Sequence, residues 1–193
     1  IPGSWKQNKH WKIREKWKMV DTNSEEFNTF VYEQQKHLHE VSRLIATSIF
    51  ELTVRVALHD NSKFSQTEIE GFIKKSPELK KLEFGTPEYY ESLASFKEVL
   101  DHHYSNNRHH PEFFKNGIKD MNLIDVLEMV CDWTAASQRM ANTDPHAGLE
   151  KQKERFGISE ELFSIIKNTV NFLQENPRGN FYKKSEETVD TSE

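Results

Sequence analysis

The sequence predicts an all-α protein, a bundle of about six to seven helices. Apolar residues recur every three or four positions along most of the 193-residue chain, which is typical of amphipathic helices packed on a core. Capping residues precede several of these runs, and alternating runs of β-branched residues are missing. The net charge of −5, from 26 basic and 31 acidic residues, argues against duplex nucleic acid as a partner.

The two ends of the chain differ from its middle. Residues 1–4 resemble a remnant of an expression tag, and the basic, Trp-rich residues 5–20 are expected to form a helix. The helical domain is expected over residues 21–176, followed by a polar, disordered tail over residues 177–193. No apolar run is long enough for a membrane span, and the single cysteine, Cys131, suits a reducing cytoplasm.

The first helices of this domain carry separate signals. Thr22 with Glu25 forms a capping-box pattern, followed by apolar residues at helical spacing up to Ile49. A second, short helix is expected through Val54 and to end at His59. The pattern therefore predicts a helix, a break and a short helix.

The middle helices are also marked at their starts. Ser65 with Glu68 forms another capping box, and this helix is expected to stop before Pro77. Thr86 followed by Pro87 is an N-cap and first-turn pair that predicts a helix of roughly twenty residues.

Two further helices are expected at 122–140 and 159–175. The first is apolar around most of its circumference, and its single polar stripe consists of Asp125, Glu128 and Asp132. Such a stripe is either the solvent face of an ordinary amphipathic helix or a row of carboxylates that points into a site.

An adjacent histidine and aspartate, His59 and Asp60, end an apolar helix, and Lys63 follows in a polar turn. Neighbouring helical side chains diverge by ~100°, so both can hold one ion only near a helix end. Imidazole nitrogen with carboxylate oxygen suits Zn, Mn, Fe, Ni or Co better than Ca. Further ligands must then come from elsewhere in the chain.

Two histidines upstream are alternatives for such a ligand. His37 is in helical register with Val41 and Leu44 and borders the expected buried face, whereas His39 points away from it. We therefore take His37 as the candidate ligand. Its alternative role is that of a helix-surface histidine with a local hydrogen bond.

Four histidines lie within residues 102–110. His103 continues an apolar stripe of its helix, and His109 and His110 follow after a short loop. We expect these three side chains to complete the site, either as ligands of a second ion or as contacts to substrate. The alternative is an exposed polar loop without a function.

The order of His37, the pair His59-Asp60 and Asp132 resembles the HD-domain superfamily of metal-dependent phosphohydrolases, and the finer pattern resembles a narrower family of phage and bacterial HD-like proteins. Ser62 stands where the superfamily commonly has Gly. The matching motifs cover roughly residues 20–142 and are His37-x-x-x-Val41, His59-Asp60-x-Ser62-Lys63, Tyr89, His102-His103-Tyr104-x-x-Asn107-Arg108-His109-His110-Pro111-Glu112, and Met121-Asn122-Leu123-x-Asp125-x-x-Glu128-Met129-x-x-Asp132-Trp133.

The resemblance implies that His37, His59, Asp60 and Asp132 hold one divalent ion, and that His103, His109 and His110 hold a further one. It implies a phosphohydrolase that acts on a nucleotide or a related phosphate ester through a metal-activated water. Two alternatives are a di-iron HD-like oxygenase and a non-catalytic module that binds a nucleotide or acts as an inhibitor. A homo-oligomer is compatible with each of the three.

Further roles follow for polar residues near these ligands. We expect Lys63 to contact the substrate phosphate as a point charge. Either Glu68 or Glu128 would accept the proton of the attacking water. Arg108, with Asn107 beside it, would bind the anionic substrate from the histidine-rich loop.

Overall fold

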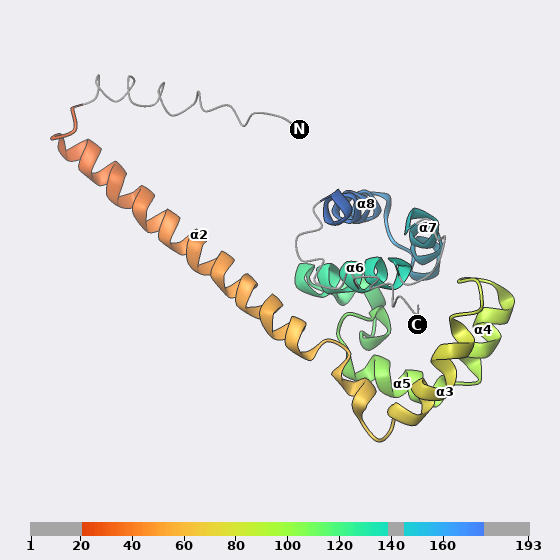
Figure 1. Ribbon diagram of the computed structural model, residues 1–193. Helices are drawn as coiled ribbons and strands as arrows, with labels where there is room; N and C mark the ends of the chain where they lie inside the picture. Colours follow the sequence, from red (N-terminus) through yellow and green to blue (C-terminus); the bar gives the residue numbers. More distant parts are fainter. Residues whose placement is uncertain (1–20, 139–144, 176–193) are drawn as a thin grey trace, which may run out of the picture. The chain divides into compact units, whose positions relative to one another are not determined.

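The computed structural model describes residues 21–138 and 145–175, where it contains seven α-helices, three 3-10 helices and no strand (Figure 1). This confirms the predicted all-α fold. The chain divides into two compact units, Ile1–Thr53 and Val54–Glu193, which are described here one at a time. The Trp-rich helix expected at 5–20 and the tail expected at 177–193 lie outside the described residues.

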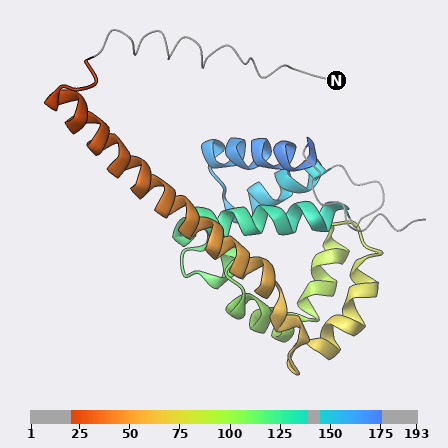
Figure 2. The same cartoon turned by 60° about the vertical axis from the view of Figure 1, so that its left-hand side comes forward.

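Helix α2 covers Glu25–Leu58 without interruption (Figure 2). Its start is capped by Ser24, whose hydroxyl oxygen accepts a hydrogen bond from Phe27 N–H at 3.1 Å, and not by the predicted capping box of Thr22 and Glu25. The predicted break after Ile49 is also wrong. Neither Gly nor Pro occurs near it, so backbone hydrogen bonding continues through the segment.

No residue of α2 is buried. His37 and His39 are both exposed, so the predicted difference in their burial is not observed. Within the first unit, α2 is the only described helix, and its apolar face therefore meets no second element among the described residues of that unit.

The second unit continues with the 3-10 helix η1 (Asn61–Phe64) and the helices α3 (Ile69–Leu79), α4 (Pro87–Ala94) and α5 (Lys97–Asn106). Helix α3 contains Pro77, although we expected it to stop earlier. The proline lies in the last turn, where the loss of one backbone hydrogen bond is tolerated.

Two other predicted features of this region need correction. The capping box of Ser65 and Glu68 does not form, because Glu68 directs its carboxylate to side chains of α5 instead. The long helix predicted after Thr86 is divided between α4 and α5. The side chain of Phe96, at the division, is buried and meets the Phe72 ring edge-on with 5.1 Å between centroids, and we attribute the division to this packing. The predicted cap itself is confirmed, since Tyr89 N–H donates to Thr86 Oγ1.

Two short 3-10 helices, η2 (Pro111–Phe113) and η3 (Gly117–Asp120), lead to α6 (Leu123–Gln138), α7 (Pro145–Phe156) and α8 (Glu160–Glu175). The last three helices pack together (Figures 1 and 2). Their apolar core consists of Met129, Val130, Leu149, Ile158, Phe163, Ile166 and Val170.

Helix α6 begins as predicted, with Asn122 Oδ1 accepting hydrogen bonds from the N–H groups of Ile124 and Asp125. Helix α8 follows Ser159 as predicted. Helix α7 was not predicted, because charged residues dominate its sequence and mask its apolar spacing.

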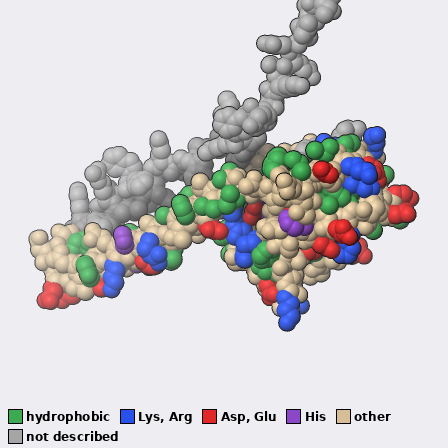
Figure 3. Space-filling view, turned by 90° about the horizontal axis from the view of Figure 1, so that it is seen from below, with side chains coloured by type: hydrophobic (Ala, Val, Ile, Leu, Met, Phe, Trp, Pro, Cys, Tyr) green, Lys and Arg blue, Asp and Glu red, His purple; other side chains and the backbone are tan. Residues whose placement is uncertain are grey.

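Two properties of the surface bear on function. None of the described helices combines the length and the apolar character needed to cross a membrane. On the face shown in Figure 3, the basic and acidic side chains of the described residues are interspersed, and no large area carries one sign of charge.

Candidate metal centre

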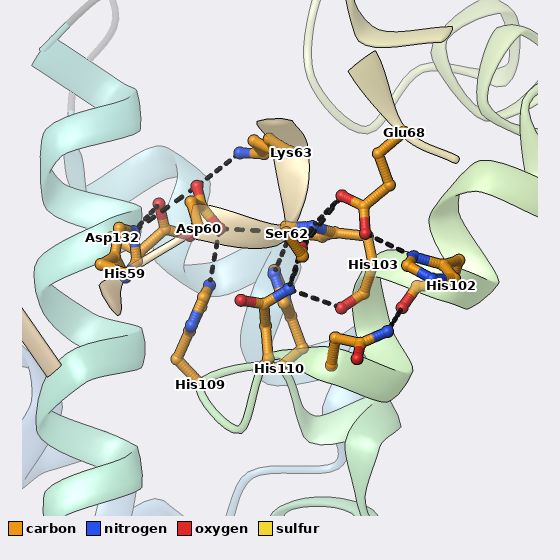
Figure 4. Close-up of polar contacts among 12 residues, drawn as sticks. His59, Asp60, Ser62, Lys63, Glu68, His102, His103, His109, His110 and Asp132 are labelled. Atoms are coloured by element: carbon orange, nitrogen blue, oxygen red, sulfur yellow. Dashed lines mark hydrogen bonds and ion pairs between the residues drawn. The ribbon is translucent and has the colours of Figure 1, made fainter. Parts of the chain in front are cut away.

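The second unit brings seven potential metal ligands together from four segments: the chain after α2, α5, the loop before η2, and α6. All of them except Glu128 are labelled in Figure 4. We call Asp60, His103, His109 and His110 the histidine group, and His59, Asp60 and Asp132 the aspartate group. Within each group, one ligand atom per residue lies within 4.8 Å of the others. A third group, His59, His109 and Glu128, overlaps with both.

Asp60 is shared by the histidine and aspartate groups. Its Oδ1 faces the Nε2 atoms of His103 and His109 at 3.3 and 3.4 Å, whereas its Oδ2 faces His59 Nε2 at 3.5 Å and the ammonium of Lys63. In Figure 4, Asp60 accordingly lies between the side chains of the two groups. One carboxylate therefore presents a different oxygen to each group.

The backbone of Asp60 supports this placement. Its φ of 57° and ψ of 14° are left-handed, and it is the only non-glycine residue with positive φ in the described part of the chain. Asp tolerates this conformation better than most residues, and such strained positions concentrate at functional sites.

Two buried atoms of the histidine group indicate that it fits a metal ion. Asp60 Oδ1 and His109 Nε2 are buried without a hydrogen-bond partner among the described residues, which is costly for polar atoms. Transition-metal bonds of about 2.0–2.2 Å place neighbouring ligand atoms roughly 2.8–3.6 Å apart, between octahedral and tetrahedral geometry. The two contacts of Asp60 Oδ1 fall in this range, as does the 3.0 Å between the Nε2 atoms of His103 and His110.

The aspartate group is more open. His59 Nε2 lies 3.5 Å from Asp60 Oδ2 and 3.7 Å from Asp132 Oδ1. Three protein ligands leave coordination positions for water or substrate, as is usual for catalytic metal sites. The fourth ligand that the resemblance implies, His37, belongs to the first unit, and its role stays a prediction.

Glu68 holds the histidines of α5. Its side chain is fully buried, and its two oxygens accept hydrogen bonds from His102 Nδ1 at 2.7 Å and His103 Nδ1 at 2.9 Å. Ser62 Oγ donates a third at 3.0 Å. Because a carboxylate only accepts, Glu68 holds the Nδ1 proton of His103, and Nε2 is the nitrogen that a metal ion beside Asp60 would find available.

Glu128 does the same for two other imidazoles. Its Oε1 lies 3.0 Å from His59 Nδ1 and 3.3 Å from His109 Nδ1. With Nδ1 as the donor in both rings, the Nε2 atoms of His59 and His109 are free to face Asp60. The third potential metal group is therefore explained as a set of hydrogen bonds that orient ligands.

The charge states of most ligands suit metal binding. Burial would raise the pKa of Asp60, but His103, His109 and Lys63 hold that pKa well below its ordinary value. Burial and the nearby His109 and His103 lower the pKa of His110 to about 3, so this ring is neutral near pH 7. Anionic carboxylates and neutral imidazoles are the forms that bind metals.

His59 and His109 are the exceptions. Burial would lower the pKa of His109, but its hydrogen bonds to Asp60 and Glu128 raise it. Hydrogen bonds to Asp132 and Glu128 raise the pKa of His59 to about 10, so its Nε2 as well as its Nδ1 carries a proton near pH 7 when no ion is bound. A metal ion must displace the Nε2 proton, and binding at the aspartate group is therefore linked to pH.

The residues predicted to bind substrate take part in internal contacts. The guanidinium of Arg108 binds Asp125 through Nε at 3.1 Å and Nη2 at 3.0 Å. The Asn107 amide donates to Ser62 Oγ and to the His103 carbonyl, both at 2.7 Å. Their roles toward substrate stay predictions.

The polar stripe of α6 points into the site rather than only to solvent, since Asp125 is fully buried and Glu128 and Asp132 are largely so. Sequence reasoning missed two contributors, Arg55 and the supporting role of Asp125. The available signals were the spacings Arg55 to His59 and Asp125 to Glu128, which put each pair on one helical face.

Comparison with known proteins gives one match. The sequence model of a family of unknown function, DUF5662, matches residues 25–176 of the chain. This range contains all residues of the histidine and aspartate groups. No curated protein and no solved structure matches the chain.

Proposed function

The chain belongs to the family of unknown function DUF5662, and from the geometry of its site we propose a metal-dependent hydrolase of phosphate esters, with nucleotides as the substrate class. One observation carries the proposal. The Nε2 atoms of His59, His103 and His109 converge on the two oxygens of a single carboxylate, Asp60, so that one residue can bridge two metal positions. Paired metal sites of this kind suit displacement at phosphorus.

A bound divalent ion of Mn, Fe, Zn, Ni or Co would supply Lewis-acid polarisation of a phosphoryl oxygen and a water of lowered pKa. Four carboxylates, those of Asp60, Glu68, Glu128 and Asp132, lie at the site. Two divalent ions would change this locally negative region into one that favours an anion.

Lys63 is the residue of this chain best placed to meet a phosphate. Its ammonium contacts Asp60 Oδ2, and its side chain is about one-third exposed, so the same ammonium can reach an anion at the mouth of the site. A lysine there acts as a mobile point charge.

Two glutamates were candidates to accept the proton of the attacking water. Glu68 and Glu128 each already accept hydrogen bonds from two imidazoles. These contacts favour a role in holding the ligands. Asp132, whose Oδ1 lies 3.7 Å from His59 Nε2, is then the carboxylate best placed to receive a proton from a water at the open positions.

The test combines metal analysis with a substrate screen. Wild-type protein, reconstituted separately with each metal, is assayed for ions per chain and for phosphate release from nucleoside mono-, di- and triphosphates, with and without O2. We expect up to two ions per chain and O2-independent release. Asp60→Asn should lose both ions and at least ~100-fold in turnover, whereas Asp101→Asn, an exposed aspartate of α5, should match the wild type.

Other results would overturn the proposal. Wild-type protein that binds no metal, or turnover that survives Asp60→Asn, would remove the metal centre from the reaction. O2-dependent conversion with two irons would favour the oxygenase alternative. Tight nucleotide binding without turnover would favour the non-catalytic module.

A further inference from the structure

One carboxylate, that of Glu128, contacts a histidine of each metal group and belongs to neither the histidine group nor the aspartate group. A single atom, Glu128 Oε1, contacts the Nδ1 atoms of His59 and His109. His59 belongs to the aspartate group and His109 to the histidine group. A displacement of the Glu128 carboxylate would therefore turn one imidazole in each group.

The position of Glu128 is in turn held by an arginine. Arg55 Nη1 lies 2.8 Å from Glu128 Oε2 and also 2.8 Å from Asp125 Oδ1. The side chains of Arg55, Glu128 and Asp125 are 11%, 12% and 0% exposed, respectively, so water competes weakly for these contacts. Arg55 also lies one helical turn before His59 in the sequence, and thus ties Glu128 to the segment that carries this ligand.

A second arginine meets the same aspartate. Asp125 accepts two hydrogen bonds from Arg108, at 3.1 and 3.0 Å, and one from Asn122 N–H at 3.0 Å. Arg108 directly precedes His109, and its guanidinium packs over the ring of Phe114 at 4.9 Å from the centroid. Asp125 thus connects an arginine near His59 with an arginine beside His109.

We infer that Arg55, Asp125 and Arg108, which we call the arginine bridge, are positioning residues that fix His59 and His109 together, so that metal affinity at both groups depends on them jointly. The inference rests on the proposed metal centre. It requires arginine at both positions, because Arg55 reaches two carboxylates with its terminal Nη1 and Arg108 binds Asp125 through two nitrogens.

A purely structural role has a different consequence. Buried ion pairs often add little net stability, and breaking one mainly leaves an unpaired charge. In that case substitution would lower the melting temperature, but folded molecules would bind metal normally. Affinity measured on the folded protein separates the two roles.

The experiment is a titration of full-length, metal-free protein with Co(II), followed by the visible absorption of the bound ion, at a temperature where circular dichroism shows each variant folded. Arg55→Lys keeps the charge, but the shorter side chain cannot place its nitrogen at the position of Nη1 between the two carboxylates. We expect both Co(II) equivalents to bind about 10–100-fold more weakly than in the wild type, as for other contacts that orient metal ligands, with a changed absorption spectrum.

Two control variants show what an unaffected site and the loss of a single site look like in this titration. Arg43→Lys in the same helix alters an exposed Arg–Glu pair with a 2.6 Å contact to Glu40 and should leave both equivalents unchanged. His110→Ala should weaken only one equivalent. If Arg55→Lys does not fold, Arg108→Lys, at the half-exposed end of the bridge, should show the same joint loss.

The inference fails if Arg55→Lys, or Arg108→Lys in its place, binds both equivalents with wild-type affinity and spectrum. It also fails if only one equivalent weakens, because the bridge would then serve a single group. Wild-type protein that binds no Co(II) would instead refute the metal centre itself, which is a distinguishable outcome.

Discussion

Replacing Glu68 by Gln tests how the buried histidine of α5 is held. The carboxylate accepts hydrogen bonds from His102, His103 and Ser62, whereas a carboxamide offers one accepting oxygen and an NH2 group. If the carboxamide oxygen keeps the hydrogen bonds from His103 and Ser62, the His102 N–H loses its acceptor. If the carboxamide is turned the other way, its NH2 group faces the buried His103 ring.

The expected loss of stability follows from these contacts. One charge-assisted hydrogen bond is lost and one donor is left facing another, which costs about 1–3 kcal/mol. For a domain of this size, each kcal/mol lowers the melting temperature by roughly 2–4 °C. We therefore expect the metal-free Glu68→Gln variant to melt about 2–12 °C below the wild type.

Metal affinity should fall as well. Without a purely accepting partner at Nδ1, the His103 ring can place its proton on Nε2, the atom that faces Asp60. Loss of such a partner typically weakens metal binding 10–100-fold. Thermal melting by circular dichroism and metal titration measure the two effects, and Glu70→Gln, at an exposed glutamate in the first turn of α3, is the matched control.

Two results would refute this reasoning. A Glu68→Gln variant with wild-type melting temperature and metal affinity would show that the hydrogen bonds of Glu68 do not hold His103. Lower melting temperature with unchanged affinity would show that Glu68 stabilises the fold without setting the protonation of the ring.

Three further predictions concern the histidines. Alanine at His103 or His110 should reduce bound metal from two ions to one, by elemental analysis of folded protein, because each removes a ligand of the histidine group alone; unchanged stoichiometry would remove that group from metal binding. The raised pKa of His59, about 10, stabilises the metal-free fold below the unfolded value near 6.5, and this contribution disappears as pH rises toward 10. The melting temperature of metal-free protein should therefore fall between pH 7 and 10, and His59→Gln should reduce that fall; equal slopes would contradict it. Finally, His37→Ala should lower metal content and His39→Ala should not, and identical behaviour of the two variants would remove His37 from the ligand set.

Helical periodicity predicted the fold class, but local signals predicted helix ends less well. Thr86 caps α4 and Asn122 caps α6 because these residues satisfy backbone N–H groups that no other element competes for. Glu68 had a capping pattern too, yet its carboxylate is buried against two imidazoles. A long-range contact of this carboxylate with two imidazoles outweighs a local one, and the sequence near Glu68 carries no sign of it.

Sequence reasoning predicted which residues belong to the candidate site more successfully than it predicted how they are arranged in space. His59, Asp60, His103, His109, His110 and Asp132 do lie together. The left-handed backbone of Asp60, which directs its two oxygens to different groups, has no signal in the sequence because Asp is compatible with several conformations there. The spacing from Arg55 to His59 puts both on one helical face, but the contact of Arg55 with Glu128, about seventy positions away, is not revealed by that spacing.

The second unit has two regions with different sources of cohesion. The apolar core draws on α6, α7, α8 and the turn before α8, whereas residues 59–68, α5 and η2 are joined largely through imidazole and carboxylate contacts. Backbone amides in the first region should exchange hydrogen with solvent only when the unit unfolds globally. In the second region they should exchange through local opening, at a rate that falls as free metal rises. A bound ion would then take the place of an apolar core in this second region. Removing the ion with a chelator would increase local opening of the segments that carry the histidines, while α6–α8 stay folded.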